Sequence, residues 1–359
     1  METQTLYQQA VTLLQELITI PSFSKEEDKT AAVIENFLKA QGVTTHRHLN
    51  NVWSVGKDYN PSLPTLLLNS HHDTVKPNPG YTRNPFEPSI EEGKLFGLGS
   101  NDAGGPLVSL IAAFLHFEKG RTGNLTFGGQ GVNLVLAATA EEEISGHNGI
   151  ECIWNKLPKI DFAIVGEPTL MKMAVAEKGL MVLDCVAKGK AGHSAREEGV
   201  NALYLAMDDI EWFRNYRFDK ISEVLGPVKM SVTVIHAGQA HNQVPAECYF
   251  TVDVRATEKY SLEEILETIK ANVRCEVKPR SLRFRSKGID KKHPLVLAAK
   301  KLGIETYGSP TTSDQALIPV PSVKIGPGDS GRSHSADEFI YVREIEEGIE
   351  QYIRLIEML

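Results

Sequence analysis

The stretch 66-LLLNSHHDTV-75 decides the fold of this chain. Its apolar first half predicts a buried strand, and His71, His72 and Asp73 follow directly. Burying such side chains without partners is costly. In an extended segment residues i and i+2 point the same way, so His71 and Asp73 share a face. A histidine beside a carboxylate is a common way to build a metal ligand with the group that orients it; the alternative is a solvated turn.

The composition is that of an ordinary globular protein. The chain has 359 residues, enough for two domains, of which 42% are hydrophobic and 23% charged. A net charge of -8 provides no basic surface for nucleic acid, and no apolar run is long enough to span a membrane. The first residues lack the features of a signal peptide, and the 4 cysteines are widely spaced without a CxxC motif. We therefore expect reduced thiols and a cytoplasmic protein.

Carboxylates follow two further apolar strands. The strand at 132–138 leads to Glu141, Glu142 and Glu143, and the strand at 162–165 leads to Glu167. Solvated acidic turns are the alternative interpretation. In open α/β sheets, ligands bind at the carboxyl ends of the strands, so these groups can converge with His71. A buried cluster with so much negative charge needs a cation.

Two other residues complete a set of metal-ligand types. Asp102 lies in the glycine-rich segment 97–105, just before a predicted helix at 106–117, where a plain helix cap is the alternative. His334 follows the strand predicted at 320–325. Two imidazoles and three carboxylates suit two zinc-like ions about 3.5–4 Å apart. The proposed ligands are His71, Asp102, Glu143, Glu167 and His334, and Glu142 is left beside them as a general base.

The pattern changes after about residue 175. Strands and helices there follow the order βαββαβ, which is typical of ferredoxin-like domains. The predicted strands are 182–187, 228–235, 249–254 and 273–284, and the predicted helices are 200–213 and 261–271. We expect residues 175–287 to form an inserted domain, with 1–174 and 288–359 forming the domain that carries the metal site.

Four motifs, in chain order, carry a family resemblance. They are His71-His72-Asp73-Thr74-Val75, Glu141-Glu142-Glu143, Gly166-Glu167-Pro168-Thr169 and His334-Ser335-Ala336-Asp337-Glu338. Together they resemble the cocatalytic zinc metallopeptidase and deacylase family, which includes acetylornithine deacetylase, succinyl-diaminopimelate desuccinylase, acyl-lysine deacetylase, aminoacylase and carboxypeptidase G. The sequence departs from the family at Asp102-Ala103-Gly104-Gly105, where Asp-Met-Lys-Gly is common.

The resemblance implies an α/β fold. It is a zinc-aminopeptidase-like catalytic domain, a mixed sheet flanked by helices, with an inserted α+β ferredoxin-like domain that acts as a lid and for dimerisation. It also implies two Zn²⁺ ions per subunit, which Co²⁺ can replace. Asp102 would bridge both ions, with His71 and Glu167 completing one site and Glu143 and His334 the other. Asp73 would orient His71, and Glu142 would activate the attacking water.

The inserted domain contains further matches. Gly192-His193-Ser194 resembles a signature whose histidine acts in the active site of the neighbouring subunit of a homodimer, with a turn histidine as the alternative. Asn242 and Arg255 match positions that contact substrate. Arg255 offers a fork suited to a carboxylate, and its alternative is a salt bridge to Asp253. Lys178 and Gly326 are further substrate-contact candidates.

The expected activity is hydrolysis of an N-acyl amino acid, first of all acetylornithine in arginine biosynthesis. The alternatives are removal of succinyl groups from ornithine, citrulline or diaminopimelate, acyl-lysine deacetylation, and di- or tripeptide hydrolysis. A non-catalytic metal-binding or dimer scaffold is a further class, and the retention of Glu142 with the full ligand set argues against it. The expected partners are a small N-acyl-amino-acid substrate and a second copy of the chain, with neither nucleic acid nor membrane.

Overall fold

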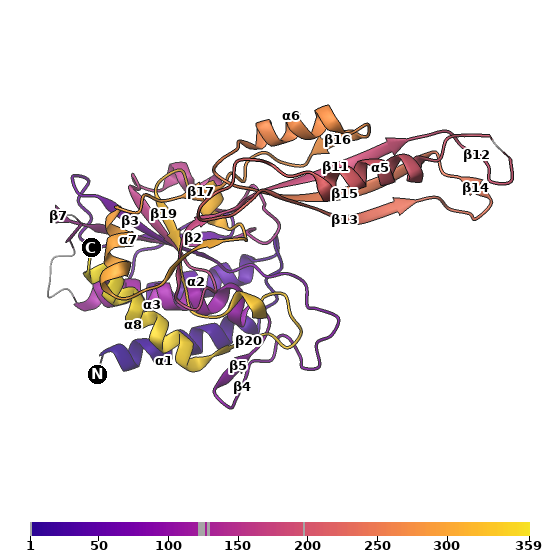
Figure 1. Ribbon diagram of the computed structural model, residues 1–359. Helices are drawn as coiled ribbons and strands as arrows, with labels where there is room; N and C mark the ends of the chain where they lie inside the picture. The colour runs from indigo at the N-terminus through magenta and orange to yellow at the C-terminus, as the bar shows by residue number, and fades with distance from the viewer. Residues whose placement is uncertain (1, 121–125, 128–129, 197) are drawn as a thin grey trace. The chain divides into compact units, whose positions relative to one another are not determined.

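The structure, a computed structural model, describes residues 2–120, 126–127, 130–196 and 198–359 (Figure 1). The chain divides into two compact units. The first comprises Met1–Val175, Ile289–Tyr307 and Ser313–Leu359, and the second comprises Ala176–Gly288 and Gly308–Thr312. The short return of the chain at 308–312 was absent from the sequence prediction. It joins the second unit through backbone and side-chain bonds: Lys178 N donates to Ser309 O at 3.1 Å, and Thr312 Oγ1 donates to Lys178 O at 2.8 Å.

The helices of the first unit follow the apolar periodicity of the sequence. Helix α3 (Gly105–Gly120) is apolar on nearly every side and is buried along most of its length. It packs between α1 (Glu2–Ile18) and α8 (Val342–Glu357), on one side of the sheet (Figure 1). The remaining helices are α2 (Asp28–Ala40), α4 (Ile150–Ile153) and α7 (Pro294–Lys301).

The centre of the main sheet is parallel. Its strands in order are β1, β2, β8, β3, β9, β19, β10 and β17, with β18 also paired to β10. The register is parallel from β8 through β3 and β9 to β19. Their bounds are β1 His46–His48, β2 Asn51–Val55, β3 Thr65–His71, β8 Asn133–Thr139, β9 Phe162–Val165, β10 Met173–Glu177 and β19 Ser322–Lys324. The carboxyl ends of β3, β8, β9 and β19 therefore lie at one edge of the sheet.

Strand β3 is buried over all seven residues, as its apolar run predicts. Leu67 packs in a cluster with Val135 and Ala163 of the neighbouring strands and with Ile150 and Ile153 of α4. Helix α3 contacts β3 and β8 as well. Because the strand cannot slip without exposing this apolar surface, the positions of the polar residues that follow it are fixed.

The segment 76–99 contains two short strands. They are β4 (Ser89–Glu91) and β5 (Lys94–Phe96), and β5 pairs with β20 (Phe339–Tyr341). Strands of three residues have too little alternation to be recognised in the sequence. Further short strands are β6 (Thr126–Phe127), β7 (Gln130–Gly131), β17 (Lys287–Gly288) and β18 (Thr306–Ser309).

The second unit has the predicted βαββαβ order. Its sheet runs β13, β15, β11, β16 with antiparallel pairing throughout. The elements are β11 Gly179–Lys188, α5 Ala202–Asn215, β13 Lys229–Ala237, β15 Glu247–Ala256, α6 Leu262–Asn272 and β16 Glu276–Pro279, with the small pair β12 (Gly192–His193) and β14 (Gln243–Val244). Strand β16 is shorter than the predicted 273–284. It begins at Glu276 and ends at Pro279, which has no N–H for the ladder.

Among the described residues, no helix is both long and apolar enough to cross a membrane.

Candidate metal centre

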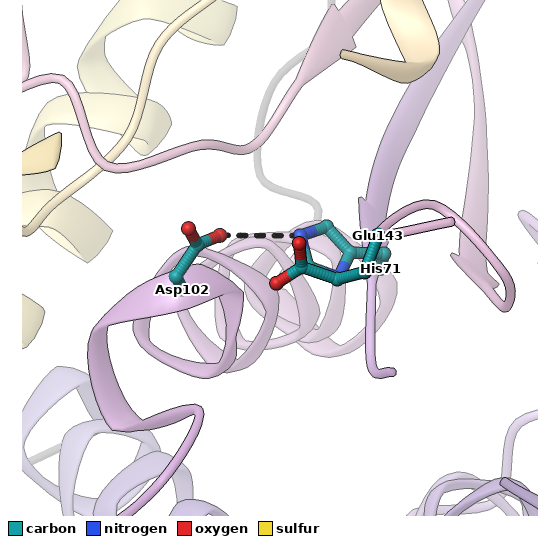
Figure 2. A group of neighbouring side chains, drawn as sticks. All are labelled: His71, Asp102 and Glu143. Atoms are coloured by element: carbon teal, nitrogen blue, oxygen red, sulfur yellow. Dashed lines mark ion pairs between the residues drawn. The ribbon is translucent and has the colours of Figure 1, made fainter. Parts of the chain in front are cut away.

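The carboxyl ends of three parallel strands bring the predicted side chains together. His71 ends β3, and its Nε2 lies 4.0 Å from a Glu142 oxygen and 3.8 Å from Glu167 Oε1. Glu142 follows β8 and Glu167 follows β9. Figure 2 shows His71 with Asp102 and Glu143, whose ligand atoms all lie within 4.8 Å of one another.

Asp102 lies between the two candidate histidines. It is presented by the kinked turn Ser100–Gly104, in which its own backbone angles are non-helical, immediately before α3. Its Oδ1 is 3.3 Å from His71 Nε2, and its Oδ2 is 3.8 Å from His334 Nε2. Each carboxylate oxygen therefore faces a different imidazole, which is the arrangement that a bridging ligand requires.

His334 reaches the same place from the C-terminal part of the chain. Its Nε2 is 3.0 Å from Glu143 Oε2. The residue has a φ of +58°, and its backbone oxygen accepts a hydrogen bond from Asn78 Nδ2 at 3.1 Å. The side chain is 55% exposed, so this half of the centre opens to solvent.

Asp73 contacts both His71 and the backbone of Glu142 and Glu143. Its backbone oxygen is 3.0 Å from His71 Nδ1, and its Oδ1 is 3.4 Å away. Its carboxylate accepts hydrogen bonds from Glu142 N at 3.0 Å, Glu143 N at 3.1 Å and Ser24 Oγ at 2.6 Å. The orientation of His71 was expected; the anchoring of Glu142 and Glu143 was not.

Two buried polar atoms in the centre have no hydrogen-bond partner within the part of the chain that the structure describes. They are His71 Nε2 and Glu167 Oε1, 3.8 Å apart. Buried polar atoms are normally satisfied, so each such atom requires an explanation. In tetrahedral coordination with bonds of about 2.0–2.1 Å, ligand atoms lie about 3.3 Å apart. The spacing of 3.0–3.8 Å between these groups fits two sets of ligands that share Asp102.

The ionisation of the cluster reflects crowded negative charge. Burial raises the pKa of Glu167 to about 8 and that of Glu142 well above its usual value. Burial would lower the pKa of His71, but Asp102 and Asp73 outweigh it and raise that pKa strongly. The contact with Glu143 raises the pKa of His334 to about 9. In the absence of a cation, therefore, protons partly neutralise the site.

The comparisons with known proteins agree with this geometry. The model of peptidase family M20/M25/M40 matches residues 67–358. The chain belongs to this family.

Members of the M20 family resemble the chain over nearly its whole length. Acetylornithine deacetylase of Proteus mirabilis is 29% identical, and the match covers 97% of this chain and 96% of that protein. The [LysW]-lysine/[LysW]-ornithine hydrolase of Sulfurisphaera tokodaii is 28% identical, covering 97% and 94%. The solved structure of an M20 family metallo-carboxypeptidase of Sulfolobus solfataricus superposes with a TM-score of 0.75 at 19% identity, covering 97% of this chain and 98% of that one. The chain is thus a metal-dependent hydrolase with the M20 α/β fold.

Four further predicted residues belong to the second unit. His193, in β12, and Asn242 are exposed on the second unit. Arg255 Nε and Nη2 bind both oxygens of Asp253, and its Nη1 donates to Thr312 Oγ1 at 3.2 Å. Lys178 Nζ donates to Pro227 O at 2.7 Å. All of these contacts are within the protein, so the roles of the four residues toward substrate stay predictions.

Gly326 follows β19 in the first unit and has a packing reason to be glycine. A Cβ there would lie 2.5 Å from Glu167 O. The small residue therefore allows the Glu167 loop to approach, and its substrate role stays a prediction.

Sequence reasoning missed several residues behind the centre. Asp314 is buried, and its Oδ2 accepts from Asn69 Nδ2 at 2.9 Å and Thr139 Oγ1 at 2.7 Å, which ties β3 to β8. Ser24 binds Asp73, as described above. Their partners are distant in the chain, so no local pattern identifies them. His72, left without a role, is structural: its ring contacts Thr30 Oγ1 and Asn50 O, and burial lowers its pKa to about 4.

Metal affinity should fall as the pH falls. The raised pKa values of Glu167 and His334 mean that, below about pH 8 and 9 respectively, these groups hold protons that a cation must displace. We expect Zn²⁺ to bind progressively more weakly from pH 9 to pH 6, with proton release. Isothermal titration calorimetry in two buffers of different ionisation enthalpy measures both. A pH-independent affinity without proton release would contradict this electrostatic description.

Proposed function

We propose that this M20 hydrolase removes an N-acyl group from an amino acid, with N-acetylornithine as the first candidate. The observation that carries the proposal is the placement of Glu142. Its carboxylate lies beside His71 at 4.0 Å, while its backbone N is anchored by Asp73. A free carboxylate next to a set of metal ligands is suited to proton transfer. The similarity to acetylornithine deacetylase and to a hydrolase of LysW-linked lysine and ornithine supports an amide bond to a basic amino acid.

The proposed cofactors are two Zn²⁺ ions, with Co²⁺ as a substitute. His71, Asp102 and Glu167 would hold one ion, and Asp102, Glu143 and His334 the other. When bound, such ions polarise a carbonyl and lower the pKa of water. Glu142 then removes a proton from the attacking water and returns it to the nitrogen of the leaving amine.

The rest of the proposed mechanism involves a second subunit. His193 of one subunit would donate a hydrogen bond to the developing oxyanion in the active site of its partner. Its exposure on the second unit is compatible with this role. The edge of β13 also supports a homodimer, because its side chains Val234 and Ile235 are 43% and 46% exposed. We further propose that the enzyme works in the cytoplasm, in arginine biosynthesis.

Positive charges on the second unit support an anionic substrate. Lys178 is buried, and burial lowers its pKa, an effect to which the charges of Lys229 and Arg255 add. Arg255 and Lys229 are paired residues of neighbouring strands. Such a group suits the carboxylate of an amino acid, and Asn242 would add a polar contact.

The three basic side chains Lys178, Lys229 and Arg255 also suit one alternative class of substrate. An N-succinyl group carries a second carboxylate, which these basic side chains would bind. N-succinylornithine or N-succinylcitrulline is therefore the second candidate. A panel of acylated substrates decides between the two. We expect N-acetylornithine to be hydrolysed with the highest kcat/KM, above the succinyl derivatives of ornithine, citrulline and diaminopimelate, N-acetyllysine, and di- and tripeptides. A preference for any other member would replace the proposed substrate.

Replacing the proposed base should separate turnover from metal binding. The variant Glu142→Gln keeps the size of the side chain but cannot take a proton. We expect kcat to fall by about 10²–10⁴-fold with the metal content unchanged, measured by steady-state kinetics and elemental analysis. Glu357→Gln, at the exposed end of α8, is the matched control and should behave as wild type. Near-normal turnover in Glu142→Gln would remove Glu142 from the mechanism.

Mixing two inactive variants tests the shared site. If His193 acts in the partner's active site, a hybrid dimer of Glu142→Gln and His193→Ala contains one complete site. We expect up to about one quarter of wild-type activity after full subunit exchange, since half of the dimers are hybrids and each has one complete site of two. Exchange is followed with differently tagged subunits. Proven exchange without recovered activity would place His193 outside the partner's site.

A further inference from the structure

One buried carboxylate joins the segment that presents Asp102 to the segment that presents His334. Glu338 is 2% exposed, and it lies four residues after His334. Its Oε1 accepts hydrogen bonds from the backbone N of Asn101 and of Asp102, both at 2.9 Å. Its Oε2 accepts one from Gly99 N at 3.0 Å. The carboxylate thus organises the turn that carries the ligand shared by both proposed metal positions.

The backbone reinforces this link. Gly97 N donates to Glu338 O at 3.0 Å, and Glu338 N donates to Tyr81 Oη at 3.3 Å. Asn101 adds a second connection: its Nδ2 donates to Asp329 O, and its Oδ1 accepts from Asp329 N, each at 3.0 Å. The turn at 99–102 is therefore held from two places in the C-terminal segment 329–338.

A carboxylate is an expensive choice for a purely structural bond at this position. Burial, together with the nearby charge of Asp102, raises the pKa of Glu338 to about 8. Three N–H donors offset part of that cost.

We propose that Glu338 is a positioning residue that makes the two metal positions fill cooperatively. Because its carboxylate binds the Asp102 turn while its backbone continues into the His334 segment, ordering of one ligand segment orders the other. The first ion thereby prepares the second position. This inference rests on the two-metal centre of the proposed function.

The variant Glu338→Gln tests the inference. An amide places an N–H₂ donor against at least one of the three backbone donors. Titration with Co²⁺, followed by visible absorption and calorimetry, should give two ions in one steep transition for wild type. In Glu338→Gln we expect weaker binding of the second ion, by roughly 10–100-fold, and two resolved transitions.

Asp337→Asn is the matched control. Asp337 is the neighbouring residue in the same segment, and it also accepts three hydrogen bonds, from Thr82 N, Thr82 Oγ1 and Arg83 N. The substitution makes the same change from carboxyl to amide one residue earlier in the segment. We expect it to keep the steep wild-type transition. Equal weakening in both variants would show a general effect of the segment and would overturn the role of Glu338.

A second measurement needs only the wild-type protein and therefore serves if Glu338→Gln does not fold. It follows amide hydrogen exchange during a titration with Zn²⁺. Peptides covering 97–104 and 333–340 should gain protection together, at the same Zn²⁺ concentration. Separate gains, or two independent ions in wild type, would overturn the cooperativity while leaving the two-metal centre intact. A wild-type protein that binds no Zn²⁺ or Co²⁺ would overturn the proposed function itself.

Discussion

The structure depends on the concentration of negative charge around one buried histidine. Asp102, Glu142 and Glu167 each place an oxygen within 3.3–4.0 Å of His71 Nε2. The buried apolar strands fix these distances, so the carboxylates cannot separate to relieve their repulsion. Protons can neutralise the cluster, as the raised pKa of Glu167 indicates, or a divalent cation can. His71 Nε2 and Glu167 Oε1, which have no hydrogen-bond partner among the described residues, favour the cation.

The surroundings of the centre consist largely of backbone donors bound to acidic side chains. Asp73 receives the N–H groups of Glu142 and Glu143, and Glu338 receives those of the Asp102 turn. A carboxylate that accepts several N–H groups is held in one position. The metal-ligand candidates are thereby held by Asp73 and Glu338, which are not themselves among the proposed ligands. Asp314 instead accepts hydrogen bonds from two side chains, Asn69 of β3 and Thr139 of β8.

The sequence predicts the parts of this arrangement that have a local signature. The apolar runs of β3, β8 and β9 end in His71, Glu143 and Glu167, and the parallel register brings these ends together. Partners far apart in the chain leave no such signature: Asp314 binds Asn69 across 245 positions, and Glu338 binds Gly99 across 239. The segment 308–312, whose partner Lys178 is distant in the chain, was missed for the same reason, and the β4–β5 hairpin was missed because its strands have only three residues each. The roles implied by the family resemblance for His193, Arg255, Lys178 and Asn242 stay predictions, since the two units are described separately.

The central claim is that the carboxyl ends of β3, β8 and β9, with the Asp102 turn and His334, hold two cations that share Asp102. Crystals of the zinc-loaded protein, measured on both sides of the zinc absorption edge, test it most directly. The account predicts two anomalous peaks per chain, about 3.5–4 Å apart, with one oxygen of Asp102 on each. A single peak, or two peaks that Asp102 does not bridge, would contradict it.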